Sequence, residues 1–281
     1  MNRSQEILDY LAANPLHRTV VLAPNAPPVA HSAGEVSIIL NVVLSASDVV
    51  DTLMWFKGLT SRRDLGNPTA GTFSFGVRNV GRIRVLYLTQ RGSKVVMVTR
   101  IPYDIPSLES VCVNAAAASK VTAAATAASG GIIAVSGPDR EVDSTFVYGV
   151  LDELNRTQRQ IIGVVEVSLS YLMSHRNSVV VQCDVGSDVE TLQEGIASVL
   201  ELDPKVLYVG GIRYAADVEL CGCAIQPGRV VIAGSHLVDA GALLARLVAQ
   251  MAPGMELGPE SPKLAVRLGR ELDGKVKVTL S

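Results

Sequence analysis

The pattern of hydrophobic and polar positions changes character about one third of the way along the chain. Residues 19–22, 72–77, 82–89 and 94–100 have the composition of strands, and turn residues at 79–81 and 90–93 separate the last three. Segment 45–56 has apolar residues at helical spacing, with Ser45 or Ser47 as its cap. Because strands joined by short turns pair antiparallel, we expect a small α+β domain over residues 1–108, with one helix packed on its sheet.

A different pattern follows after an alanine-rich stretch. Residues 109–130 favour helix but offer little apolar bulk, which predicts a linker with a leading helix. Beyond it, short apolar runs of strand length occur at 132–135, 161–165, 178–181, 206–209 and 230–233, and a last strand-like run occurs at 275–280. Helix-like segments at 144–156, 189–202, 215–225 and 239–251 lie between the runs. This alternation predicts an α/β domain over residues 131–281, with a mostly parallel sheet between helices.

Composition narrows the functional classes. Hydrophobic residues make up 48% of the chain and charged residues 19%, which is typical of a globular protein with a large core. The net charge of −2 gives no reason to expect a nucleic-acid partner. The chain shows neither a signal peptide nor an apolar run long enough to span a bilayer. We therefore expect a cytoplasmic protein that reaches a membrane only through its partners.

Cysteine spacing gives no indication of a metal. The four cysteines include no CxxC pair, and Cys221 and Cys223 have no further ligands at metal-binding spacing. We therefore expect no metal site in this chain.

The segment that follows residues 132–135 has the context of a phosphate-binding loop, because a predicted strand, a glycine and a predicted helix follow one another. Against the pattern GxxxxGK[ST], Gly137 matches the first glycine and Ser144 the hydroxyl that binds magnesium. Val142 stands at the second glycine and Asp143 at the lysine. The candidate loop comprises Gly137, Pro138, Asp139, Arg140, Glu141, Val142, Asp143, Ser144 and Thr145. By this motif alone, an unrelated strand, loop and helix explains the segment equally well.

Ordered partial matches along the rest of the chain favour one family. They lie at residues 19–34, 72–75, 81–85, 90–93, 101–102, 105–109, 182–186, 202–213 and 227–229. In these segments the sequence resembles the PilT-type retraction ATPases and the wider type II/IV secretion ATPase superfamily. The resemblance implies a RecA-like P-loop NTPase core preceded by a smaller, PAS-like α+β domain. It also implies ATP and magnesium as ligands, and rings of six in which the first domain packs on a neighbour.

The chain departs from the family pattern where that pattern places catalysis. The family's acidic motif, Glu-Asp-Pro-x-Glu, corresponds here to residues 166–170, where only Glu166 is acidic. Gly211 stands at the glutamate of the second nucleotide motif, and Tyr214 at an aspartate. Arg213 and the signature histidine, His236, are present. The resemblance further implies that Arg82, Arg84 and Arg91 of the first domain face phosphate, although an exposed polar sheet face explains Arg82 and Arg84 equally well.

These departures lead us to expect an inactive relative that regulates or scaffolds an active pilus or secretion ATPase, or another machine component. Asp143 would repel phosphate, cap the helix and fill the phosphate position from within the protein. No cofactor is then expected. The alternatives are a weak ATPase in which Arg140 replaces the lysine, and a protein that binds another ligand at the strand ends. His236 is also explained as a packing residue, and Glu166 as an exposed strand terminus. A homo-oligomer, either a ring of six or a smaller assembly, remains open.

Overall fold

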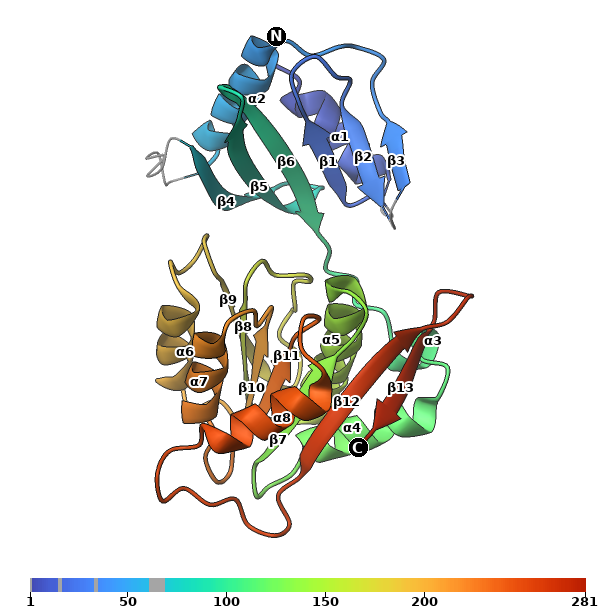
Figure 1. The fold of residues 1–281 in the computed structure, drawn as a ribbon. Coiled ribbons are helices and arrows are strands. Elements are labelled where there is room, and N and C mark those ends of the chain that lie inside the picture. The colour runs from blue at the N-terminus through green and yellow to red at the C-terminus, as the bar shows by residue number, and fades with distance from the viewer. Residues whose placement is uncertain (1, 15–16, 33–34, 61–68) are drawn as a thin grey trace. The chain divides into compact units, whose positions relative to one another are not determined.

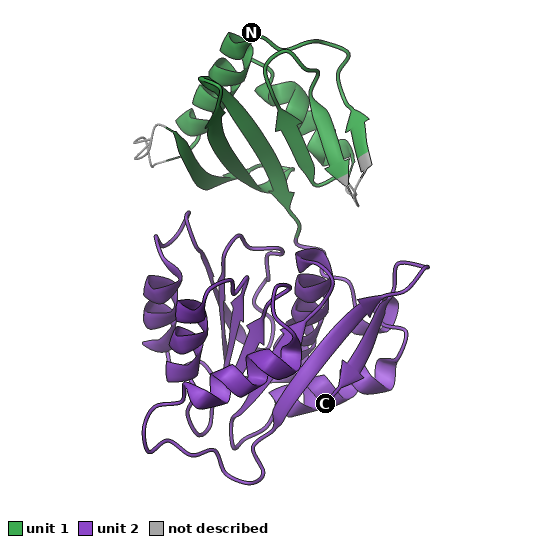
Figure 2. Ribbon diagram, in the orientation of Figure 1, with its two compact units in different colours: residues 1–102 green, residues 103–281 purple. Residues whose placement is uncertain are grey.

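The computed structural model describes residues 2–14, 17–32, 35–60 and 69–281, so the end of the 19–34 match lies outside the described residues. The chain divides into two compact units, Met1–Pro102 and Tyr103–Ser281 (Figure 2). Each unit has its own sheet and its own hydrophobic core.

The first unit contains a six-stranded antiparallel sheet. Its strands are β1 (Thr19–Leu22), β2 (Val29–Ser32), β3 (Glu35–Ile38), β4 (Ala70–Val77), β5 (Gly81–Gln90) and β6 (Ser93–Ile101), in the order β3-β2-β1-β6-β5-β4. The predicted strands at 72–77, 82–89 and 94–100 are confirmed as β4, β5 and β6, which pair through the predicted turns.

In the described part of the first unit, two helices, and not one as expected, cover the apolar face of this sheet. They are α1 (Ser4–Ala13) and α2 (Ala46–Gly58). The prediction missed α1, although Ile7 and Leu11 are spaced four apart and are buried in the same core as Phe56 of α2. Ser45 is the cap of α2, since its side chain accepts the amide hydrogen of Asp48 and the Asp48 carboxylate accepts that of Ser45.

The second unit contains a seven-stranded, mostly parallel sheet, as predicted. Its strands are β7 (Gly131–Ser136), β8 (Ile161–Glu166), β9 (Val179–Asp184), β10 (Val206–Gly210), β11 (Val230–Gly234), β12 (Lys263–Arg270) and β13 (Val276–Leu280), in the order β13-β12-β7-β11-β10-β8-β9. Among these strands β13 alone runs antiparallel to its neighbour. Strand β12 was not predicted. Glycines and prolines precede it, and its alternation of apolar and polar residues, in which Val266 and Leu268 are buried, is short.

Helices cover both faces of this sheet (Figure 1). The second unit contains α3 (Leu108–Val111), α4 (Ala115–Ala125), α5 (Arg140–Thr157), α6 (Leu192–Leu200), α7 (Ala215–Cys223) and α8 (Ala240–Ala249). Helices α6, α7 and α8 share one core with β8, β10 and β11, whereas α4 and α5 pack together and against β7. The alanine-rich stretch therefore forms α4, whose small side chains lie against the sheet of the second unit.

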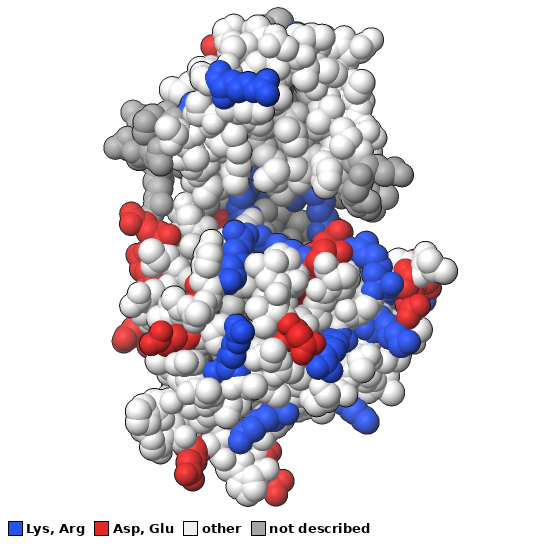
Figure 3. Space-filling view, in the orientation of Figure 1, with Lys and Arg blue, Asp and Glu red and all other residues white. Residues whose placement is uncertain are grey.

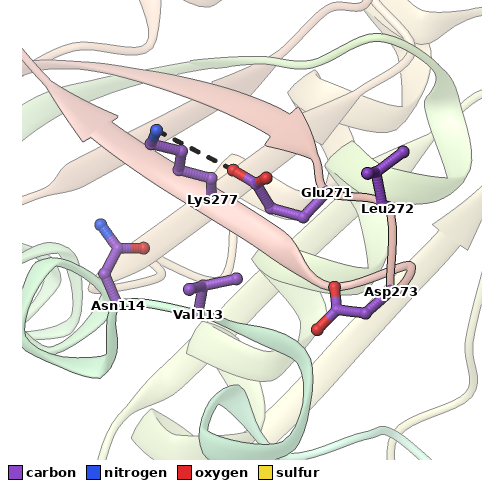
Figure 4. A pocket seen from close by; sticks show the side chains of 6 residues that line it. All are labelled: Val113, Asn114, Glu271, Leu272, Asp273 and Lys277. Carbon is purple, nitrogen blue, oxygen red and sulfur yellow. Dashed lines mark ion pairs between the residues drawn. The ribbon is translucent and has the colours of Figure 1, made fainter.

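The surface of the second unit has no large region of a single charge in the view of Figure 3, because basic and acidic side chains are interspersed on it. Beside the turn that joins β12 and β13 lies a pocket of about 460 Å³ (Figure 4). It is lined by Val113, Asn114, Glu271, Leu272, Asp273 and Lys277, and Lys277 lies 3.9 Å from Glu271. Within the described residues, no helix combines the length and the apolar character needed to cross a bilayer.

Candidate functional site

The carboxyl ends of four parallel strands form one edge of the larger sheet. Pairing register places Val135 of β7, Gly234 of β11, Gly210 of β10 and Glu166 of β8 in one row across that edge. Ligands of open α/β sheets bind outside such strand ends. The candidate residues of the second unit all lie on these strand ends or on the segments that follow them.

The loop after β7 leads directly into α5, which begins at Arg140. Its N-cap is Asp139, whose side chain accepts the amide hydrogen of Val142 at 2.9 Å. The expectation that Asp143 caps this helix is therefore wrong. Asp139 comes one residue before the helix, where its side chain can accept one of the first free amide hydrogens, whereas Asp143 lies at the end of the first helical turn.

The carboxyl group of Asp143 turns toward the start of the loop. A Cβ atom placed on Gly137 would lie 2.4 Å from Asp143 Oδ1, so the carboxyl rests directly against this glycine. Asp143 is only 4% exposed, and Oδ1 has no hydrogen-bond partner among the described residues. Burial, reinforced by the charge of Asp139, raises the pKa of Asp143 to about 7.

The other loop residues differ in their surroundings. Val142 and Ser144 are buried, and Thr145 Oγ1 lies 2.9 Å from the hydroxyl of Tyr171. Pro138 and Glu141 are exposed. Arg270 of β12 pairs with Asp139 at 3.1 Å and lies 3.7 Å from Glu141, which ties the mouth of the loop to the neighbouring strand.

Glu166 is fully buried, so the interpretation of this residue as an exposed strand terminus is wrong. Its Oε1 accepts hydrogen bonds from the hydroxyls of Ser144 at 3.2 Å and Ser170 at 3.0 Å. Its Oε2 accepts from the hydroxyl of Tyr148 and from the amide of Ser170, both at 3.0 Å. A buried carboxylate is stable only with such donors, and here α5 and the segment after β8 supply them.

Arg140 completes this cluster. One of its guanidinium nitrogens lies 3.4 Å from Glu166 Oε1 and donates to the carbonyl oxygen of Ser168. The side chain thus links the first residue of α5 to the segment after β8. It is directed to protein groups within the site.

The segments after β10 and β11 hold the remaining candidates of this unit. Gly211 has φ = +78°, a backbone conformation that favours glycine, and Arg213 and Tyr214 are exposed. Burial, together with the positive charges of Arg140 and Arg213, lowers the pKa of His236.

The candidate arginines of the first unit lie on one hairpin. Arg82 and Arg84 stand opposite Ile101 and Thr99 of β6 and therefore share a sheet face, as the alternation predicts. Arg84 is only 5% exposed, so an exposed polar face does not explain it. Arg91 is exposed in the turn between β5 and β6, with φ = +50°. Their role toward phosphate remains a prediction.

Sequence reasoning missed two residues of the Glu166 cluster, Tyr148 and Ser170. Tyr148 follows Ser144 by four positions and therefore lies on the same face of α5, so helical spacing could have identified it. Ser170 gave no such signal, because its position depends on the path of the chain after β8. Among the described residues, no group of three or more His, Cys, Asp or Glu side chains is arranged to hold a metal ion.

A mostly parallel sheet with a strand, loop and helix of the P-loop type, preceded by an antiparallel α+β unit, is the architecture of a RecA-like core with a smaller leading domain. The family model described as "Type II/IV secretion system protein" matches residues 62–277. The chain belongs to this family. The predicted fold class is confirmed.

Individual relatives place the chain near the pilus ATPases. It is 26% identical over 281 residues to the type IV pilus retraction ATPase PilT of Pseudomonas aeruginosa, covering 98% of this chain and 77% of that protein. It is 22% identical over 227 residues to the type IV pilus ATPase PilU of the same organism, covering 81% of this chain. The matched region spans 58% of the length of PilU.

Solved structures show the same fold. The crystal structure of the pilus retraction motor PilT with bound ADP matches with a TM-score of 0.74 and 23% identity, covering 100% of this chain and 83% of that one. The ATPase DotB of Legionella pneumophila matches with a TM-score of 0.70 and 18% identity, covering 99% and 78%.

Proposed function

We propose that this chain is a catalytically inactive relative of the pilus and secretion motor ATPases that acts as a regulatory or scaffolding component. The hydrogen bonding of Glu166 carries the proposal. The hydroxyl of Ser144, which the P-loop motif would offer to magnesium, donates instead to this buried carboxylate. Because Tyr148, Ser170 and Arg140 also engage Glu166, the carboxylate that Ser144 contacts is bound by protein groups on both oxygens.

The position of Asp143 supports the same proposal. Its carboxyl rests against Gly137, where a working loop needs open space for phosphate oxygens. When ionised, it replaces the attraction of a lysine by repulsion. At 4 Å, one such unit-charge contact is worth about 1 kcal/mol in water and about 4 kcal/mol at an effective dielectric constant of 20.

The machine that it serves is a type IV pilus or a type II secretion-like system, and its partner is an active ATPase of that machine or another component. The likeness to PilT and PilU supports this assignment. We place the protein in the cytoplasm, at the membrane only through its partners and without a nucleic-acid ligand. A homo-oligomer is compatible with this role.

The competing function is a weak ATPase in which Arg140 takes the place of the lysine. The geometry of Arg140 argues against it, because its guanidinium contacts Glu166 and the carbonyl of Ser168. Gly211 also offers no side chain that could activate water.

Calorimetric titration with ATP and magnesium tests the proposal. We expect the wild type to bind more weakly than about 1 mM. The variant Val142→Gly, Asp143→Lys rebuilds the motif at two positions and should bind at least about tenfold more tightly, since one repulsion becomes an attraction. Micromolar affinity of the wild type, or hydrolysis that Ser144→Ala abolishes, would favour the weak ATPase.

A further inference from the structure

Two loops at the carboxyl edge of the larger sheet present exposed apolar side chains. Tyr214 precedes α7 and is 71% exposed, and Leu237 follows β11 and is 60% exposed. They lie beside the candidate site, on the segments that follow β10 and β11. Apolar side chains exposed next to a functional edge are candidates for an interaction surface.

Hydrogen bonds hold both loops in place. Asp217 Oδ2 accepts the amide hydrogens of Arg213 and Tyr214, each at 2.9 Å. Ser235 Oγ donates to the carbonyl oxygen of Ile212 at 2.8 Å and accepts the amide hydrogen of Leu237 at 3.3 Å. The two loops are thereby tied to each other, so binding would cost little additional ordering.

Arg213 places one positive charge beside these apolar groups, directly before Tyr214 in the chain. Arg213 is exposed, and its guanidinium forms no ion pair with any described residue, whereas the nearby Asp217 carboxylate is occupied by backbone amides.

We propose that Arg213, Tyr214 and Leu237 form a docking surface for an acidic segment of a partner protein, in which carboxylates alternate with large apolar side chains. Arg213 pairs with a carboxylate of the segment, while Tyr214 and Leu237 receive its apolar side chains. Tyr and Arg are the residues in which interfaces concentrate their binding energy. The inference rests on the proposed function, because it names the surface through which an inactive relative would bind its machine.

The chemistry of the surface favours such a segment over a free anion. A nucleotide phosphate would use the positive charge of Arg213 but would leave Leu237 without an apolar partner. A wholly apolar segment would leave Arg213 unpaired beside a desolvated contact, which is costly. A segment that carries both properties satisfies the three side chains together.

A displayed library of random peptides tests the surface. The library is selected on the full-length chain and depleted on the Arg213→Ala, Tyr214→Ala double variant. We expect enrichment of peptides that combine Asp or Glu with Leu, Ile or Phe. Fluorescence anisotropy of an enriched peptide should then show at least a tenfold loss of affinity for Arg213→Glu and for Tyr214→Ala, and a smaller loss for Arg213→Lys.

Leu272→Ser is the matched control, because Leu272 is fully exposed on the turn between β12 and β13, away from these loops. It should change the affinity by less than twofold, and all variants should keep the wild-type melting temperature. The inference is overturned if the selection enriches no peptides or enriches basic or uncharged ones. It is also overturned if Arg213→Glu leaves the affinity for an enriched peptide unchanged. ATP with magnesium is titrated in parallel, because tight ATP binding would refute the proposed inactive role. Whether the docking surface exists is judged from the peptide binding alone, so the two proposals can fail separately.

Discussion

The first turn of α5 and the end of β8 each bury one carboxyl group, yet the two groups differ in their hydrogen-bond partners. Glu166 is fully buried and receives hydrogen bonds from Ser144, Tyr148 and Ser170, with Arg140 beside it. Asp143 is 4% exposed, and its Oδ1 has no partner in the described parts of the chain. The contrast shows that the two buried carboxyl groups differ in their hydrogen-bond donors and not in the depth of their burial.

The two carboxylates also differ in what they do for the fold. Glu166 joins α5 to the segment after β8, so its hydrogen bonds organise the site. Asp143 joins nothing through Oδ1 and faces a second acid, Asp139, whose charge contributes to the raised pKa. A buried group that lowers stability and makes no structural contact is typical of a functional position and not of a structural one.

Removing the Glu166 carboxylate should have the largest effect. Glu166→Ala leaves the guanidinium of Arg140 and the hydroxyls of Ser144 and Tyr148 without their acceptor. We expect the free energy of unfolding to fall by about 3–5 kcal/mol, measured by urea denaturation. Glu166→Gln keeps one acceptor oxygen and should lose less. A loss below about 1 kcal/mol for Glu166→Ala would contradict the role of the cluster.

The opposite change is expected at Asp143. Asp143→Asn removes a carboxyl whose pKa is raised from 3.8 to about 7. A shift of that size corresponds to about 4 kcal/mol, so at pH 8 the variant should be more stable than the wild type by up to about 4 kcal/mol. Near pH 4 the two proteins should unfold at similar urea concentrations, because Asp143 is then protonated in the folded state.

The sign of the pH dependence follows from the raised pKa. Between the unfolded value of 3.8 and the folded value of about 7, the folded state holds a proton that the unfolded state has released. This contribution to stability is therefore greatest below pH 3.8 and is lost as the pH rises through 7, by about 1.4 kcal/mol per pH unit. A profile for Asp143→Asn that falls as steeply as that of the wild type would assign the effect to another group.

The sequence predicted the sheet of the second unit better than the site at its edge. The apolar runs at 161–165 and 206–209 became β8 and β10 because both faces of a central strand are buried, which leaves a continuous signal. The loop was located by Gly137 and Ser144. Which acid caps α5 was not predictable from composition, since Asp139, Glu141 and Asp143 all suit a helix start and only the backbone geometry selects Asp139.

The role of Glu166 was hidden for a related reason. A glutamate at the end of an apolar run is equally compatible with solvent and with a buried cluster. The difference depends on Ser170 and Tyr148, which reach it from a segment without regular structure and from α5. Long-range convergence of this kind leaves no periodic trace in the sequence.

Loss of a single donor to Glu166 should have a smaller effect than loss of the carboxylate. Ser144→Ala removes the hydrogen bond to Glu166 and the one that Ser144 accepts from the hydroxyl of Ser170. Because Ser170 can still donate to Glu166, the free energy of unfolding should fall by about 1 kcal/mol in urea denaturation. In the Glu166→Gln background the same substitution should cost less, because the acceptor has already been weakened. Equal costs in both backgrounds would show that Ser144 stabilises α5 without Glu166.

The smallest change in stability is expected for Asp139→Asn. Asparagine caps helices as well as aspartate does, so the hydrogen bond to the amide of Val142 can be kept. The exposed pair with Arg270 is lost, and the charge that raises the pKa of Asp143 disappears. These opposing effects should leave the free energy of unfolding within about 1 kcal/mol of the wild type.

The informative measurement for Asp139→Asn is the pH at which the stability profile levels off, since this marks the folded pKa of Asp143. It should move below that of the wild type, because one of the two causes of the shift is gone. Glu141→Gln is the matched control: it removes an exposed charge one residue into the helix that does not contribute to that shift, and should leave the levelling pH in place. If Asp139→Asn also leaves the levelling pH unchanged, burial alone raises the pKa of Asp143. Asp143 and Glu166 then differ only in whether hydrogen-bond donors surround the buried carboxyl group.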